Sequence, residues 1–156
     1  MSINIIQEKV NKINSILEST MLRLSIILIS NHSDDLFEIG EKLVIDHCDE
    51  IANGGFWVWN HNTNEVYYSP KFCNTLGYEY GELGKGFGGF NRGNVEQMKN
   101  GMDMIQNLIN TNSKDTFINY IDFTKKDGSI INIECSGAIL FIGEIPFVIL
   151  GTHKLK

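Results

Sequence analysis

The chain has 156 residues and a formal net charge of −6, with 13 Lys and Arg residues against 19 Asp and Glu residues. This length suits one well-filled domain with an appendage better than two ordinary domains. The acidic balance and the scattered lysines exclude a general basic field, so we expect no nucleic-acid partner.

Residues 3–27 carry apolar side chains in alternating steps of three and four, with one polar interruption at Thr20. This heptad pattern predicts a helix whose apolar stripe packs on another helix, on the sheet or on a second subunit. Residues 35–52 keep helical spacing as well, so we expect residues 1–52 to form a helical hairpin. The residues expected at its helix or dimer interface are Ile6, Val10, Ile13, Leu17 and Leu24.

The chain carries no sign of membrane insertion or secretion. Its most apolar stretch, residues 21–29, contains Arg23 and is far shorter than the roughly 20 residues of a spanning helix. No basic start or small-residue cleavage site resembles a signal peptide. The three cysteines are widely spaced, which favours reduced thiols in a cytoplasmic protein.

Two short strands are predicted at residues 56–59 and 66–68, joined by a polar turn at residues 61–64. Side chains alternate along a strand, so Trp57 and Trp59 face one side of the sheet while Phe56 and Val58 face the other. A strand that is apolar on both faces needs cover on both, and it is therefore expected at the centre of its sheet. Phe56 and Val58 would meet the N-terminal helices.

Helices and a loop follow the hairpin. Ser69 and Pro70 begin a short helix that Gly77 ends, and six glycines within residues 81–93 predict a mobile loop. Asn94 caps a helix over residues 95–110. The apolar residues expected on its inward side are Val95, Met98, Met102, Ile105 and Ile109.

Three strands are predicted after this helix, at residues 117–123, 130–141 and 146–153. The second alternates between polar and apolar residues, which is typical of a half-solvated strand. Residues 147–150 are apolar on both faces, like residues 56–59. We therefore expect the first and last strands to be neighbours at the buried centre of the sheet.

Three segments resemble the PAS domain family: GFWVWNHNTNEVYYSPKFCNTLGY, KKDGSIINIECSGAIL and IPFVILGTH, within residues 51–153. The resemblance implies an α+β fold, with a five-stranded antiparallel sheet and helices inserted between strands 2 and 3. The predicted PAS-like domain covers residues 53–156, and the helical hairpin precedes it. The family implies a sensory or interaction module with a pocket between the concave sheet face and the inserted helices, often dimeric through flanking helices.

Comparison with the family's cofactor motifs disfavours covalent flavin and haem. The chain lacks the Asn-Cys-Arg-Phe-Leu-Gln-like segment of its flavin photosensors, and Cys73 lies too early to replace that cysteine. The haem-binding members use a histidine on the long helix, and residues 95–110 contain none. No histidine pair has the spacing of a zinc site, and no motif indicates a catalytic residue, so we expect neither a metal nor an enzyme.

The pocket that the resemblance implies is the remaining candidate site. It could hold a small apolar or aromatic ligand, or it could be filled core, and the sequence leaves both open. Its expected lining is Trp57, Trp59, Cys73, Met98, Met102, Ile105, Tyr120 or Ile121, Cys135 and Ile149.

We therefore predict a stand-alone PAS-type sensory and protein-interaction module that forms a homodimer through its N-terminal helices. Because the sequence ends at Lys156 without an effector segment, the output is expected to run through those helices or a separate signalling partner. The alternative is a ligand-free adaptor for a separately encoded kinase or transcription factor. A small enzyme using the cavity is disfavoured, because no polar constellation converges there.

Overall fold

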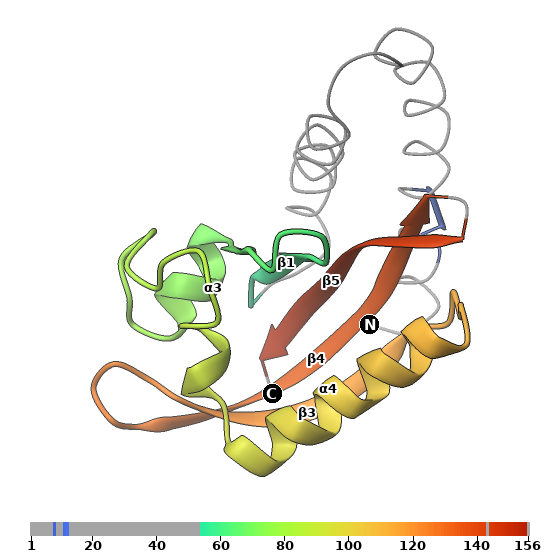
Figure 1. Cartoon of the computed structure of the whole chain (residues 1–156). Helices are drawn as coiled ribbons and strands as arrows, with labels where there is room; N and C mark the ends of the chain where they lie inside the picture. Colours follow the sequence, from blue (N-terminus) through green and yellow to red (C-terminus); the bar gives the residue numbers. More distant parts are fainter. Residues whose placement is uncertain (1–7, 9–10, 13–53, 143, 156) are drawn as a thin grey trace, which may run out of the picture.

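The structure, a computed structural model, describes residues 8, 11–12, 54–142 and 144–155 (Figure 1). The predicted helical hairpin lies outside these residues, apart from Glu8, Asn11 and Lys12, which are helical and exposed. The strands are β1 (Phe56–Asn60), β2 (Val66–Tyr68), β3 (Phe117–Thr124), β4 (Ile130–Ile142) and β5 (Ile145–Leu155). The helices are α3 (Pro70–Thr75), the 3₁₀ helix η1 (Phe90–Arg92) and α4 (Val95–Asn110).

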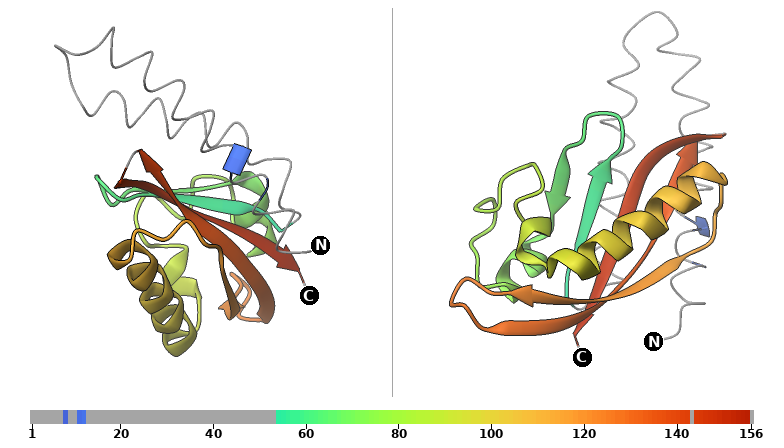
Figure 2. Two further views of the ribbon diagram at one scale, coloured as in Figure 1. Left: turned by 90° about the vertical axis from the view of Figure 1, so that its right-hand side faces the viewer. Right: turned by 60° about the horizontal axis from the view of Figure 1, so that its bottom comes forward.

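The five strands form one antiparallel sheet in the order β2-β1-β5-β4-β3. The first and last strands are therefore neighbours at the centre, as predicted, with Trp57 opposite Gly151 and Trp59 opposite Ile149. All three helices are inserted between β2 and β3, and α4 runs diagonally across one face of the sheet (Figures 1 and 2). The predicted sheet topology is confirmed.

Side-chain hydrogen bonds cap the N-termini of α3 and α4. The Ser69 hydroxyl caps α3 by accepting a hydrogen bond from the Phe72 amide at 3.2 Å, and it also accepts from the Phe56 amide at 2.9 Å. Asn94 caps α4 by accepting from the Gln97 amide at 3.1 Å. The Gln97 side chain then accepts from the Asp122 amide at 2.6 Å, which fastens the start of α4 to β3.

The glycine-rich segment forms a loop of successive turns, as predicted, up to Gly89. Its end differs from the expectation, because Phe90–Arg92 closes into η1. The Phe90 ring is 5 % exposed and lies against the rings of Trp57 and Tyr68. A buried aromatic anchor therefore orders the end of a segment whose glycine content predicted only a loop.

Both faces of the central strands are buried. The inner face packs against α3, η1 and α4 through Trp57, Ile133, Cys135 and Ile149. The outer face is equally closed to solvent, with Phe56 1 % exposed and Val58 fully buried. The other buried apolar residues of the outer face are Ala138, Leu140, Val148 and Leu150. Figure 2 shows α4 on one face of the sheet, and α3 packs into the core on that same inner face through Phe72 and Cys73.

Two expectations about solvent exposure are wrong. Val95 was expected to face inward, but it is 86 % exposed, because it begins α4 and only residues from Met98 onward lie over the sheet. β4 was expected to be half-solvated throughout; residues 130–134 are partly exposed, with only Ile133 buried, but residues 135–141 are buried on both faces. This half of β4 pairs with β5 in the covered centre of the sheet, so its small polar residue Ser136 is buried as well.

Candidate functional site

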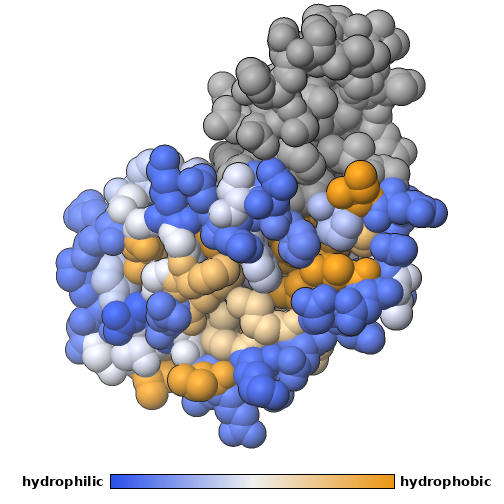
Figure 3. All heavy atoms as spheres, in the orientation of Figure 1, coloured by the Kyte–Doolittle hydropathy of each residue, from blue (hydrophilic) through white to orange (hydrophobic). Residues whose placement is uncertain are grey.

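The space between α4 and the inner face of the sheet corresponds to the predicted pocket. Its lining residues include Trp57 on β1, Met98 and Met102 on α4, Asn119 on β3 and Cys135 on β4. These side chains leave a cavity of only about 20 Å³. Such a volume holds about one water molecule, whereas small-molecule sites in proteins occupy about 300–1,000 Å³. Figure 3 shows the apolar band between the polar surface of α4 and the loop after α3.

Trp57 fills most of this space. Its side chain is 5 % exposed and meets the Phe90 ring edge-on, with 4.8 Å between the ring centroids. The indole lies directly over Gly151, where an added Cβ would come within 2.2 Å of ring atoms. The glycine therefore makes room for the tryptophan, and the two residues together close the floor of the pocket.

A buried histidine lies beside Trp57. The indole Nε1–H of Trp57 donates a hydrogen bond to His153 Nε2 at 3.1 Å, so the imidazole proton is on Nδ1. Nδ1 has no hydrogen-bond partner in the described part of the chain, and the ring packs between Phe72 and Phe123, with centroid distances of 4.8 and 5.5 Å. Burial lowers the pKa of His153 to about 3, so the imidazole is neutral at neutral pH.

The backbone of His153 holds the start of the domain. Its amide donates to the Gly55 carbonyl at 2.8 Å, and its carbonyl accepts from the Gly54 amide at 2.9 Å. Gly55 has a φ of +96°, and an added Cβ would lie 2.2 Å from the Phe72 amide nitrogen. The indole of Trp57 is thus connected through one side chain to the point where residues 1–53 join the sheet.

The structure brings some predicted residues together and separates others. Trp57, Met98, Met102, Ile105 and Cys135 line the same space. Ile149 is buried in the same core without lining the cavity.

Trp59 lies nearer the edge of the domain. Its indole donates to the Asn64 side chain at 3.2 Å, and its ring contacts Phe87 and Phe90. Like Ile149, it is outside the lining of the inner cavity.

Of the two alternatives on β3, Ile121 lines the cavity and Tyr120 does not. Tyr120 is 46 % exposed, and its hydroxyl donates to Glu134 at 3.2 Å on the outer side of the sheet. Its assignment to the pocket is wrong because Asn119 and Ile121 have the inward phase of the strand. Sequence reasoning also missed Phe90, Asn119 and His153. Trp57 pairs with Gly151 across β1 and β5, and His153 follows Gly151 by two residues, so its side chain lies on the same face as Trp57.

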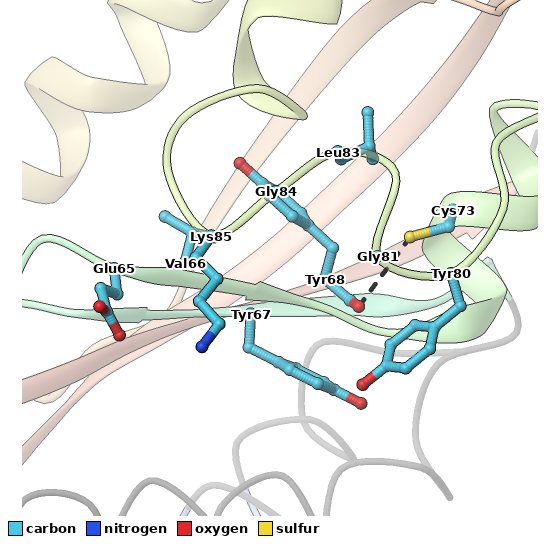
Figure 4. Close-up of a pocket in the computed structure, with 10 residues that line it drawn as sticks. All are labelled: Glu65, Val66, Tyr67, Tyr68, Cys73, Tyr80, Gly81, Leu83, Gly84 and Lys85. Carbon is cyan, nitrogen blue, oxygen red and sulfur yellow. Dashed lines mark hydrogen bonds between the residues drawn. The ribbon is translucent and has the colours of Figure 1, made fainter.

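Cys73 belongs to a different and larger space. It lines a cavity of about 370 Å³ beside β2, formed with Tyr67, Tyr68, Tyr80 and Leu83 (Figure 4). The two cavities are separated by the rings of Tyr68 and Phe90, which meet edge-on at 5.7 Å. This second space was not predicted from the sequence.

The comparisons with known proteins identify the fold. No family profile and no curated protein sequence matches the chain. Among solved structures, it is similar to the PAS domain of the fruit-fly ELK potassium channel, with a TM-score of 0.57 and 15 % identity over 73 % of this chain and 94 % of that one. A sensory box histidine kinase/response regulator from Burkholderia thailandensis E264 gives 0.56 and 20 % over 71 % and 82 %.

A third similar structure is the N-terminal domain of a diguanylate cyclase with a PAS/PAC sensor from Marinobacter aquaeolei, with a TM-score of 0.52 and 14 % identity over 64 % of this chain and 92 % of that one. The fold is that of a PAS domain. At these identities the likeness concerns architecture, and it agrees with the central pairing of β1 with β5.

The inner cavity does not fit a flavin or a haem, because side chains fill the space that either group would need, among them Trp57, Phe90, Met98 and Met102. Among the described residues, no three His, Cys, Asp or Glu side chains gather as metal ligands do. Within residues 54–155, as far as the structure describes them, the His153 side chain hydrogen-bonds only to the Trp57 indole, which is neither a nucleophile nor an acid. No helix in the described part is long and apolar enough to cross a membrane.

Proposed function

We propose that this PAS-type domain is a sensory and protein-interaction module in signal transduction. In this proposal, residues 1–53 cover the outer face of the sheet and join two copies in a homodimer. The similar structures come from a sensory box histidine kinase/response regulator, a diguanylate cyclase with a PAS/PAC sensor and a potassium channel, and the first two names describe sensing. The observation that carries the proposal lies on the sheet itself.

That observation is the burial of the outer face. Phe56, Val58 and Leu150 are at most 1 % exposed, although α3 and α4 cover only the other side. Burying such side chains contributes about 1.5–3 kcal/mol each. The chain before Gly54 carries the heptad stripe that could supply this cover. Glu8 and Lys12, which lie off the stripe, are exposed in a helical segment.

The junction suggests how a signal would travel. A shift of the Trp57 indole acts on His153 through their hydrogen bond, and His153 pairs by its backbone with Gly54 and Gly55, where the N-terminal residues begin. The sheet would thus communicate with whatever packs on its outer face. Trp57 lies on β1 and His153 on β5, so this signal would pass through the paired strands β1 and β5.

The oligomeric mass of the full chain tests the proposal. Light scattering at micromolar concentration should give twice the mass of one chain, and Ile13→Asp on the predicted stripe should give a monomer. Lys12→Asp is the matched control, because Lys12 is exposed on the same helical segment, and it should leave the dimer intact. A wild-type monomer, or equal effects of the two variants, would contradict the proposal.

A second candidate is a ligand-free adaptor for a separately encoded signalling protein. The filled inner cavity of about 20 Å³ favours it, because the usual ligand space of the fold is occupied by side chains. Native mass spectrometry of the purified full chain separates the two candidates. Bound small-molecule mass supports the sensor, and a bare chain that responds to no ligand supports the adaptor.

A further inference from the structure

The cavity beside β2 is a space with the dimensions of a ligand site. Its volume of about 370 Å³ lies within the range of about 300–1,000 Å³ that is usual for small-molecule pockets. It lies between β2 and residues 80–85 (Figure 4). Tyr68 lines it and meets Phe90, which lines the inner cavity, edge-on. No part of the inner cavity contributes to it, so it is a separate candidate.

Hydrogen bonds and an ion pair hold the loop that walls this cavity in place. The Val66 amide donates to the Lys85 carbonyl at 2.7 Å, so the loop runs along the free edge of β2. The Tyr68 hydroxyl donates to the Gly86 carbonyl at 2.7 Å. At the other end, Lys126 pairs with Glu82 at 2.8 Å and ties the loop to the β3–β4 turn. A preformed cavity of this kind binds with little ordering cost.

Apart from Glu65 and Lys85, the residues that line the cavity are uncharged, and three of them are tyrosines. Tyr67 and Tyr80 meet edge-on with 6.3 Å between ring centroids, and Tyr80 is 60 % exposed at the mouth. Figure 4 shows both rings on the same side of the loop. Burial raises the pKa of Tyr68 to about 12 and also raises the pKa of the Cys73 thiol, so both remain neutral. Such walls suit a flat aromatic molecule, since stacked or edge-on ring pairs are favourable.

One cation lies at the mouth. Lys85 lines the cavity, and its ammonium forms no ion pair with any described residue. The Glu65 carboxylate also lines the cavity, but it points away from the tyrosine pair in Figure 4. An ammonium beside aromatic walls recognises a ring that carries an anionic group.

We propose that the cavity between β2 and residues 80–85 binds a small flat aromatic molecule bearing one carboxylate, with its ring against Tyr67 and Tyr80 and its carboxylate at Lys85. This inference deepens the proposed function by naming its input. The meaning of the site as a sensor rests on that function, whereas binding is measured independently of it. The loop is hydrogen-bonded to β2, and β2 pairs with β1, so a bound ligand would act on β1 through these contacts.

Titration calorimetry on the full chain with indole-3-acetate tests the proposal, with neutral indole-3-ethanol and cationic tryptamine as companion probes. Indole-3-acetate should bind saturably and more tightly than the other two. Tyr80→Ala should weaken binding about tenfold, because one ring contact is lost, and Tyr80→Phe should retain it. Lys85→Gln should weaken indole-3-acetate about threefold to fivefold, as expected for an exposed charge, and leave indole-3-ethanol unchanged.

Two matched variants control for indirect effects. Tyr120→Ala removes another exposed tyrosine, on β3, and Lys154→Gln removes another exposed lysine, on β5. Both should bind indole-3-acetate like the wild type. Absence of saturable binding at millimolar concentration overturns the proposal, as does binding that Tyr80→Ala leaves unchanged. Tighter binding of tryptamine overturns the assignment of the carboxylate. A wild-type monomer that still binds indole-3-acetate would remove the dimer and leave this site standing.

Discussion

The two cavities of this PAS-fold domain differ in how far side chains fill them. The inner one, beneath α4, is filled to about 20 Å³ by Trp57, Phe90 and the methionines, while the one beside β2 keeps about 370 Å³ between tyrosines. The inner region is therefore packed core that contributes stability, and in our proposals it also transmits a shift through His153, while the cavity beside β2 binds the ligand. In this molecule the space beneath α4 is filled core, and the larger open volume lies beside the edge strand β2.

The largest expected effect is on stability and concerns the inner region. Trp57→Ala should lower the free energy of unfolding by about 3–5 kcal/mol, because the indole fills the space between β1, η1 and α4. Chemical denaturation of the full chain measures this. Trp59→Ala is the matched control and should cost less than half as much, since Trp59 is only partly buried. Equal losses would mean that Trp57 is no more central than its neighbour.

A smaller effect is expected from overfilling the same region. Gly151→Ala should cost about 1–3 kcal/mol, because the new Cβ meets the rigid Trp57 ring at 2.2 Å. Gly86→Ala in the loop beside the other cavity should be close to neutral, because nothing lies within 4 Å of its added Cβ. Thermal unfolding of both variants compares them. A tolerated Gly151→Ala would show that the inner packing is looser than described.

The pH dependence of stability should report the buried imidazole. The pKa of His153 falls from 6.5 to about 3 on folding, so between these values the unfolded chain binds a proton that the folded chain does not. Stability from this group is full above pH 6.5 and is lost as the pH falls, by up to about 1.4 kcal/mol per pH unit. Denaturation of wild type and His153→Gln from about pH 7 to about pH 5 tests this. Parallel curves for the two proteins would contradict it.

The smallest change in stability is expected for a substitution in the cavity beside β2. Tyr80→Ala should change the free energy of unfolding by less than about 0.5 kcal/mol, because its ring is 60 % exposed. The same variant should lose most of its affinity for indole-3-acetate. Loss of stability as large as that of Trp57→Ala would make the tyrosine pair part of the core and remove the contrast between the regions.

The sheet was predictable from sequence because its signals are local. Two apolar stretches at residues 56–59 and 147–150 required cover on both faces, which placed β1 beside β5. Ser69, Pro70 and Asn94 marked helix starts through capping chemistry that depends on few residues.

The site was less predictable because it depends on register and on packing. Tyr120 and Ile121 are adjacent large side chains, either of which could face the pocket. Only the register of β3 decides that Ile121 points inward and Tyr120 outward. His153 enters the site through the pairing of Trp57 with Gly151. The cavity beside β2 depends on the Val66–Lys85 hydrogen bond, and glycine-rich composition cannot specify where a loop docks.

Methyl NMR of the full chain during titration with indole-3-acetate tests most directly whether a ligand binds in the cavity beside β2 and not in the space beneath α4. The Leu83 methyl groups report the cavity beside β2, and those of Met98 and Met102 report the space beneath α4. We predict that the Leu83 signals shift with saturation while the two methionine signals stay in place. Shifts of Met98 and Met102 with an unchanged Leu83 would contradict the account.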